Sequence, residues 1–379
     1  MAANKNNKAL NVPPLRFPEF TEEWEETTLG KISEIKKGSG ISKDQLSEQG
    51  SPCILYGELY TKYKSEIINE VYSRTELDSP SLVKSKANDV IIPCSGETAI
   101  DISTARCIPC NNILLGGDLN IIRLKYDNGG FFAYQLNGAR KKDIARVAQG
   151  VSVVHLYGEN LKQIRVYHPA IEEQKKLAEF IALLDERIAT QNKIIEKLET
   201  LIKALSHKLT SQKEPNTLLK DCLVCHSSTL LENNVKEKGK YPVYGATGIC
   251  GYTDENDISG DAILIIKDGA SVGTATYATG KYSVIGTLNY LQSSQDNYLL
   301  PYIYYSLKAF NFAPYITGMA IPHIYFRDYG KAKIWCPDIV EQKRITTALS
   351  TMDFKLQIEQ NILRNLISQK QYLLSNLFI

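Results

Sequence analysis

The chain has 379 residues, of which 43% are hydrophobic and 23% charged, and its formal net charge is +2. This length predicts two or three domains, and the composition excludes wholesale disorder. No segment approaches the roughly 18 consecutive apolar residues that span a bilayer, and the first residues, MAANKNNKALNVPP, lack the apolar core of a secretory signal. We therefore expect a cytoplasmic protein without a membrane segment. Its eight cysteines are widely spread, which predicts reduced thiols. The small net charge neither requires nor excludes nucleic acid as a ligand.

The sequence begins with an N-terminal arm, residues 1–19, and a first globular segment, residues 20–168. Short β-branched runs such as DVIIP (89–93), separated by glycine-rich turns, predict a strand-rich domain with a few helices.

A long helix is predicted next, over residues 169–213. It opens with PAIEEQKK (169–176), in which a proline at the first turn precedes two carboxylates near the positive end of the helix dipole. A heptad pattern then follows, with spacings that alternate between four and three and with apolar residues at every position but one, Gln191. Its positions are Leu177, Ile181, Leu184, Ile188, Gln191, Ile195, Leu198, Ile202, Leu205 and Leu209. A straight helix from Leu177 to Leu209 is about 48 Å long. This length favours a spacer over an ordinary core helix, and Pro215 ends it.

A second globular segment, residues 214–336, and a second long helix, residues 337–379, repeat this order. The segment contains the strand-like run DAILIIK (261–267), and the helix opens with PDIVEQKR (337–344) and is expected to continue to Ile379. Its heptad positions are Leu349, Met352, Leu356, Glu359, Leu363, Leu366, Lys370, Leu373 and Leu377.

The two halves of the chain are related by a shift of 168 residues. Residues 149–211 align with 317–379 without a gap, and the identities include Gly150, His155, Tyr157, Gln174 and Asp185 with Gly318, His323, Tyr325, Gln342 and Asp353. The globular segments correspond more weakly, for example GDLNIIRL (117–124) with GTLNYLQS (286–293). We predict an α+β protein with a pseudo-two-fold internal repeat, in which two strand-rich domains are separated by two long helices packed as an antiparallel coiled coil.

These features together resemble the specificity subunit of a type I restriction–modification system, over essentially the whole chain. The resemblance is carried by the order of parts, the two PxxxEQ(K/R) openings, LRFPEFTEEWEETTLGKI (15–32), and YPVYGATGICGYTDE (241–255) followed by DGASVGTATY (268–277). It implies that each domain is a target recognition domain for one half of a split DNA sequence and that the helices set the distance between the half-sites. It also implies a non-catalytic subunit that recruits two modification (methyltransferase) subunits and, through them, restriction subunits. No cofactor is expected in this chain; S-adenosylmethionine, ATP and Mg²⁺ are expected on the partner subunits.

Candidate DNA-binding residues follow from two needs, cations for phosphates and polar side chains on turns for base edges. The cations are Lys36, Lys37, Arg140, Lys141, Lys142, Arg146, Lys240, His323 and Arg327, and the candidate base-reading residues are Ser95, Glu97, Thr98, Lys267, Ser271 and Thr274. A solvated surface or a structural loop is the alternative for each. For docking of the modification subunits the candidates are Glu173, Gln174, Glu341 and Gln342, with helix capping as the alternative.

Several other motifs are disfavoured. CLVCH (222–226) has the haem c attachment spacing, and Cys107, Cys110, Cys222 and Cys225 would form a zinc site only across two domains. A nuclease that uses Asp338, Glu341 and Lys343 has the wrong spacing for its metal-binding acids, and DGASVGT lacks the P-loop lysine. A self-contained nuclease and a coiled-coil scaffold without a DNA role remain the alternative functions.

Overall fold

The structure, a computed structural model, describes residues 11–211 and 213–379. The expected arm therefore lies outside the described residues over 1–10. The chain forms two compact units, Met1–Gln191 with Ile362–Ile379, and Asn192–Asn361, so that both long helices contribute to both units.

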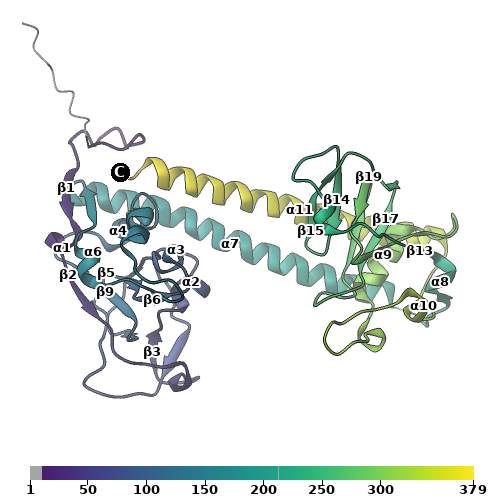
Figure 1. The fold of residues 1–379 in the computed structure, drawn as a ribbon, viewed down its shortest axis with the longest axis horizontal. Helices are drawn as coiled ribbons and strands as arrows, with labels where there is room; N and C mark the ends of the chain where they lie inside the picture. Colours follow the sequence, from purple (N-terminus) through teal and green to yellow (C-terminus); the bar gives the residue numbers. More distant parts are fainter. Residues whose placement is uncertain (1–10, 212) are drawn as a thin grey trace, which may run out of the picture. The chain divides into compact units, whose positions relative to one another are not determined.

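The first unit contains a globular domain, drawn in purple to teal in Figure 1, together with the yellow C-terminal end of the chain. Its strands are β1 (Glu25–Thr28), β2 (Ser33–Lys37), β3 (Ser51–Ile54), β4 (Ser73–Thr75), β5 (Asp89–Pro93), β6 (Ser95–Gly96), β7 (Arg106–Ile108), β8 (Leu114–Leu115), β9 (Leu119–Leu124), β10 (Val154–His155) and β11 (Arg165–His168). Its helices are α1 (Leu29–Ile32), α2 (Glu58–Thr61), α3 (Ala99–Ile102), α4 (Gly129–Asn137), α5 (Lys141–Val147) and α6 (Gly158–Lys162).

The second unit repeats this plan. Its strands are β12 (Thr217–Leu218), β13 (Leu223–Ser227), β14 (Tyr241–Gly245), β15 (Gly248–Thr253), β16 (Ile258–Ser259), β17 (Ala262–Ile266), β18 (Ala275–Ala278), β19 (Lys281–Val284), β20 (Leu288–Ser293) and β21 (Lys333–Ile334). Its short helices are α8 (Leu219–Cys222), α9 (Leu300–Ala309) and α10 (Phe326–Tyr329).

Each domain is built on the same antiparallel four-stranded sheet. The strand order is β2-β9-β5-β7 in the first domain and β13-β20-β17-β18 in the second. The predicted strand DVIIP is β5 and DAILIIK contains β17, and both are buried along their whole length, as expected for central strands covered on both faces. The remaining sheets differ, since β4-β3-β8 has three strands and β15-β14-β19-β16 has four. The predicted strand-rich, duplicated domains are confirmed.

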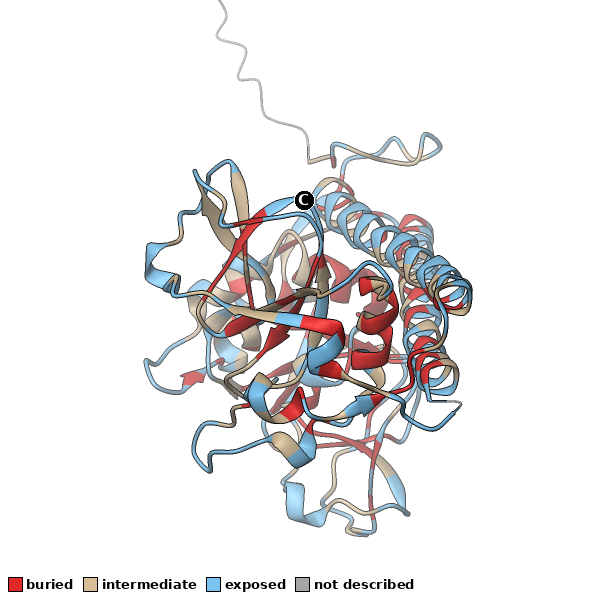
Figure 2. Cartoon of the chain, turned by 90° about the vertical axis from the view of Figure 1, so that its right-hand side faces the viewer, coloured by how far each residue is buried: buried red, intermediate tan, exposed pale blue. Residues whose placement is uncertain are grey.

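The two long helices are α7 (Ile171–Thr210) and α11 (Ile339–Asn376), and they pack antiparallel (Figure 1). At 40 and 38 residues, each is close to 60 Å long at 1.5 Å per residue. Every predicted heptad position is buried or half-buried. Each helix also carries exposed stretches (pale blue in Figure 2) and further buried residues outside the seam, such as Gln174 and Gln342. The predicted coiled-coil seam is therefore confirmed.

The sequence predicted that the second long helix continues to Ile379, and this prediction is wrong. The helix ends at Asn376, and Leu377 and Phe378 are buried in the core of the first domain, where the Phe378 ring lies 5.3 Å from that of Phe131. Their burial explains why these two positions are apolar, because removing apolar side chains from water stabilises the fold.

Each domain is attached to the start of the long helix that follows it by a buried glutamine. In the first domain the Gln174 amide accepts a hydrogen bond from the Asn128 N–H (2.9 Å) and donates to Asp127 and the Pro169 carbonyl. In the second, Gln342 accepts from the Leu299 N–H (2.9 Å) and donates to the Asn297 and Pro337 carbonyls. The identical glutamines of the repeat therefore make equivalent connections, which differ in that Gln174 donates to the Asp127 side chain and Gln342 to the Asn297 backbone carbonyl.

An aspartate about three turns after the glutamine on each long helix makes a second contact that both units share. The Tyr134 hydroxyl of α4 donates to Asp185 of α7 (2.9 Å), and the Tyr305 hydroxyl of α9 donates to Asp353 of α11 (2.8 Å). In the first unit Lys370 of α11 also binds Asp185 (2.5 Å) and Glu66, and all three side chains are about nine-tenths buried. Burial raises the pKa of Asp185, whereas Lys370 lowers it. This ion cluster explains why a lysine occupies a heptad position.

We expect Lys370→Ala to destabilise the first unit by about 3–5 kcal/mol, because it removes the cation that pairs directly with two buried carboxylates. The measurement is urea unfolding followed by Trp24 fluorescence in a Trp335→Phe background, since these are the two tryptophans of the chain. Lys355→Ala, which removes an exposed pair with Glu359, is the matched control and should cost less than about 0.5 kcal/mol. Equal effects of the two substitutions would show that the buried cluster does not hold the helices.

Candidate nucleic-acid interface

The first domain brings a polar turn and a hairpin together at one end of its main sheet. Strand β5 ends at Pro93, and the following turn, residues 94–98, carries β6, which pairs with β10 in the register His155 with Ser95. The hairpin, residues 149–155, is closed by two backbone hydrogen bonds between Gln149 and His155. The Leu156 N–H then donates to the Cys94 carbonyl (2.8 Å). We call this turn and hairpin, with Asp118, the first loop edge.

The second domain has the same arrangement. The turn after β17, residues 267–274, lies beside a hairpin, residues 317–323, that is closed by two hydrogen bonds between Thr317 and His323. Asp268 and His323 form an antiparallel bridge, and the Ile324 N–H donates to the Lys267 carbonyl (2.9 Å). Turn, hairpin and Thr287, the counterpart of Asp118, form the second loop edge. Two segments far apart in the sequence therefore meet in each domain.

The polar residues of the first loop edge differ in their availability. The Ser95 hydroxyl donates to Asp118 (3.2 Å), and Glu97 is exposed. The Thr98 hydroxyl caps α3 by accepting from the Asp101 N–H, so this residue has a structural role. Burial raises the pKa of the Cys94 thiol to about 11, although the nearby positive charge of Lys37 lowers it. Asp118, whose carboxylate is exposed at this edge, was not predicted as a site residue. Within GDLNIIRL it looks like an ordinary polar residue before a strand.

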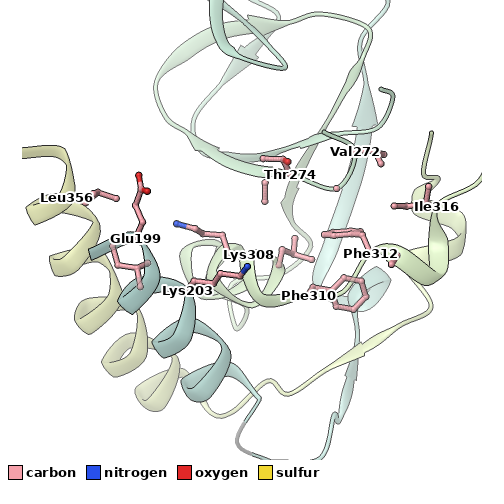
Figure 3. Close-up of a pocket in the computed structure, with 14 residues that line it drawn as sticks. Glu199, Lys203, Val272, Thr274, Lys308, Phe310, Phe312, Ile316 and Leu356 are labelled. Atoms are coloured by element: carbon pink, nitrogen blue, oxygen red, sulfur yellow. The ribbon is translucent and has the colours of Figure 1, made fainter. Parts of the chain in front are cut away.

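The second loop edge presents different chemistry at the equivalent positions. Lys267 and Asp268 replace Cys94 and Ser95, and an exposed threonine, Thr287, replaces Asp118. Ser271 and Thr274 are exposed, and the Thr274 N–H donates to the Ser271 carbonyl (3.1 Å). Thr274 also lines a cavity of about 600 Å³ (Figure 3), whose other walls include Lys203, Lys308 and Phe312.

The predicted cations divide into exposed and structural groups. Lys142 and Arg146 are exposed on α5, which packs against α3 directly after the first polar turn. Arg140 and Arg146 both pair with Asp143 (3.2 and 2.9 Å), but Arg146 is 75% exposed, whereas Arg140 is 19% exposed and lies 5.4 Å from the centre of the Tyr167 ring. Burial lowers the pKa of Lys141. Arg140 and Lys141 are therefore less accessible than Lys142 and Arg146.

The other cations lie in three places. Lys36 is exposed on β2 and pairs with Glu34 (3.0 Å). Arg327 follows the second hairpin and lies 4.7 Å from the centre of the Tyr325 ring. Lys240 directly precedes β14, which belongs to a different sheet, β15-β14-β19-β16. The structure therefore does not group Lys240 with the second loop edge.

Three of the four residues expected to bind partner subunits are used within the chain. Glu173 is 1% exposed and forms two hydrogen bonds of 2.7 Å with Arg16, and Gln174 and Gln342 are the buried connections described above. Their burial corrects the expectation, because a side chain with satisfied internal bonds offers nothing to a docking surface. Glu341, paired with Arg344 at 2.6 Å, lies at the surface and stays a prediction.

A different surface on the helices is open to a partner. In the first unit, exposed apolar side chains of α7 and α11 line a groove of about 1100 Å³, including Phe180, Leu183, Ile362 and Tyr372. In the second unit Ile194, Leu201, Phe354 and Ile358 are likewise exposed on these helices. The heptad analysis assigned only the inner seam and overlooked this outer stripe, although its spacing is visible in the sequence.

The disfavoured metal and nuclease motifs have other uses. Asp338 caps α11 by accepting from the Val340 and Glu341 N–H groups (3.0 and 2.9 Å). Cys222, the first cysteine of CLVCH, is buried in the core of the second domain. Within residues 11–211 and 213–379, no group of three or more His, Cys, Asp or Glu is arranged to hold a metal ion. No helix in the described part of the chain has the length and apolar character needed to cross a membrane.

The comparisons with known proteins identify the family. The family described as "Type I restriction modification DNA specificity domain" matches residues 21–200 and 222–367, so the match occurs twice and covers most of the chain. The chain therefore belongs to the type I restriction–modification DNA specificity family. This confirms the resemblance inferred from the PxxxEQ openings and the order of domains.

Similar proteins cover nearly the same length. A relative from Mycoplasma pneumoniae named as a type I specificity subunit is 22% identical and spans 94% of this chain and 96% of its own. A second, from Mycoplasma genitalium, is 23% identical over 75% of this chain and 74% of its own. The crystal structure of a type I restriction–modification S subunit from M. genitalium has a TM-score of 0.67 and 20% identity over 97% of this chain and 99% of that one. It shows a shared fold.

The division of the cations generates a test of their roles. If Lys142 and Arg146 each contact one phosphate, as the sequence predicts, then Lys142→Ala and Arg146→Ala should each weaken DNA binding equally on all sequences and reduce the magnitude of the salt slope by about 1. Lys86→Ala, an exposed lysine before the opposite end of β5, is the matched control. Salt titrations of DNA affinity measure the effect, and slopes that match the control would remove α5 from the interface.

Proposed function

We propose that this chain is a non-catalytic subunit that reads an asymmetric, two-part DNA target, with one loop edge for each half-site. The observation that carries the proposal is the pair of loop edges: the backbone framework is the same in both domains, but the polar side chains differ at equivalent positions. A framework kept constant with variable donors and acceptors is what recognition of two different base sequences requires. The membership of the family supports DNA as the ligand.

Base reading would use groups of different hydrogen-bonding character. Asp118 and Glu97 are acceptors, which match the exocyclic amines of cytosine and adenine, whereas Lys267 is a donor that matches the O6 and N7 of guanine. Ser95, Ser271 and Thr274 are able to donate or accept. The two half-sites should therefore differ, unlike those of a palindrome read by a symmetric dimer.

The helices would serve as the spacer. Two paired helices are stiffer than one, and each recognition domain is fixed to them by a buried glutamine and an aspartate–tyrosine hydrogen bond. Rigid attachment in each unit makes the number of unread base pairs a property of helix length.

Recruitment of two modification subunits, and through them of restriction subunits, would use the exposed apolar stripe on the helices. The groove in the first unit presents Leu183 at 61% exposure and Tyr372 at 60%, which is unfavourable unless another apolar surface covers it. S-adenosylmethionine, ATP and Mg²⁺ would be bound by those partners. A scaffold without a DNA role is the second candidate, favoured by this same stripe, and it predicts no dependence of DNA affinity on sequence.

The spacer is tested by removing one heptad from each helix at facing positions, residues 195–201 and 354–360. This deletion keeps the seam in register and shortens the pair by about 10.5 Å, equivalent to about three base pairs. We expect the unread gap to shrink by about that amount while both half-sites stay unchanged. Mapping of methylated positions after co-expression with the modification subunit measures it. An unchanged gap would contradict the spacer.

Recruitment is tested by Leu183→Glu and Tyr372→Glu, which place charges in the apolar groove. We expect each to weaken association with the modification subunit by at least tenfold, because the carboxylate would be desolvated in the complex. Native mass spectrometry of the co-expressed proteins measures the association. Tyr126→Glu, on an exposed residue outside the helices, is the control. Association at the wild-type level in both groove variants would place the modification subunit elsewhere.

A further inference from the structure

The two hairpins carry a feature that base reading does not explain, which is an exposed apolar tip. In the first hairpin Val151 is 95% exposed and Val153 is 53% exposed, and in the second Met319 and Ile321 are fully and 65% exposed. Apolar side chains at such exposure lower solubility without contributing to folding. Their recurrence at equivalent positions calls for a common cause.

The hairpins hold these tips in a fixed conformation. Both begin at a glycine with positive φ, +118° at Gly150 and +89° at Gly318. A Cβ atom at either glycine would clash with the carbonyl oxygen three residues further along the chain. The distance would be 2.1 Å to the Val153 oxygen at Gly150 and 2.3 Å to the Ile321 oxygen at Gly318. Leu156 and Ile324, which follow the hairpins, are each 1% exposed in the domain cores. Each hairpin is therefore anchored at its base in a domain core, while its tip residues stay exposed.

The surroundings of both tips are aromatic and cationic. In the first domain the His155 and Tyr157 rings are stacked at 6.2 Å, and Arg146 is 75% exposed four residues before Gly150. In the second, the His323 ring lies 5.0 Å from that of Tyr325, over which the exposed Arg327 is placed. Cations beside an apolar projection complement a polyanion that also has apolar grooves.

The two loop edges differ where bases would be read but agree in the hairpins. Gly150, His155 and Tyr157 are identical to Gly318, His323 and Tyr325, and both tips are apolar. A contact that is the same in two domains reading different half-sites must address something that both half-sites share. The sugar–phosphate walls and the groove floor of the duplex meet this condition, because sugars offer apolar surface at every base pair.

We propose that the hairpins 149–155 and 317–323 are paired, sequence-independent DNA contacts, in which the apolar tips pack against the sugars and groove of the duplex beside each half-site. This inference rests on the proposed function, because it takes DNA as the ligand of the loop edges. It assigns affinity to the tips and leaves sequence preference to the polar turns. Duplex DNA is favoured over a partner protein because each hairpin is hydrogen-bonded directly to the turn that carries the polar residues, and because the helices offer a separate apolar surface.

The test uses the full chain co-purified with its modification subunits and two duplexes, one with the mapped target and one with both half-sites scrambled. The variants V151S/V153S and M319S/I321S keep the exposed, hairpin-compatible backbone and remove only the apolar groups. We expect each to lose about tenfold in affinity for both duplexes, with an unchanged ratio between the two duplexes and an intact complex in native mass spectrometry. Leu231→Ser, at a 64% exposed leucine outside the loop edges, should bind as the wild type does.

Three results would overturn the proposal. Affinity within twofold of the wild type would show that the tips do not contact DNA. Loss restricted to the target duplex would make them base readers, and loss of the modification subunits would make them a protein-docking surface. Gly150→Ala and Gly318→Ala, which keep the tip residues but strain their presentation, should reproduce the loss. A wild-type complex that binds both duplexes equally would refute the proposed function itself, independently of the tips.

Discussion

The connection between each recognition domain and the paired helices is the constraint on which the structure depends. A long amphipathic helix is marginal by itself, and most of its stability comes from the face that it buries. Here the seam positions of α7 and α11 are buried or half-buried. A domain core covers part of the seam in each unit, at Leu177 and Ile181 in the first and at Leu349 in the second. Gln174 and Gln342 then bind the backbone in front of α4 and α9, so that a shift of the helix by one residue would leave buried amide groups unpaired.

Duplication followed by divergence accounts for what the two domains share. The main sheets have the same strand order, and the glutamine, the aspartate–tyrosine contact and the glycine hairpin recur. The differences lie in the smaller sheets and in the residues at the loop edges, where Asp118 corresponds to Thr287 and Ser95 to Asp268. Positions that determine attachment have stayed the same, and positions that would contact bases have changed, which is the division expected when both domains use one scaffold for two sequences.

The helices and the family were predictable from sequence because their signals are local and periodic. The heptads, the proline openings and the repeat each depend on residues close together in the chain, and α7 and α11 lie where these patterns place them. The loop edges were only partly predictable. Ser95 and Lys267 stand out as polar residues after buried strands, but their proximity to residues 149–155 and 317–323 arises from strand pairing over more than 50 residues.

Roles that depend on burial were the hardest to predict. Glu173 and Gln174 were expected at a partner surface on the long helices, whereas they are buried and bound by Arg16 and Asn128. Lys370 was predicted only as a heptad position, and nothing in the sequence indicated its ion pairs with Asp185 and Glu66. In each case the partner lies far away in the sequence, and no pattern within a few residues marks it.

The most direct measurement of the central claim is the exchange of one recognition domain. Residues 20–168 would be replaced by the corresponding domain of another specificity subunit of this family, and the methylated positions mapped after co-expression with the modification subunit. If each domain reads its own half-site from a common spacer, one half-site changes to that of the donor, while the other half-site and the gap stay the same. A change in both half-sites, or a gap that varies with the domain, would contradict this account.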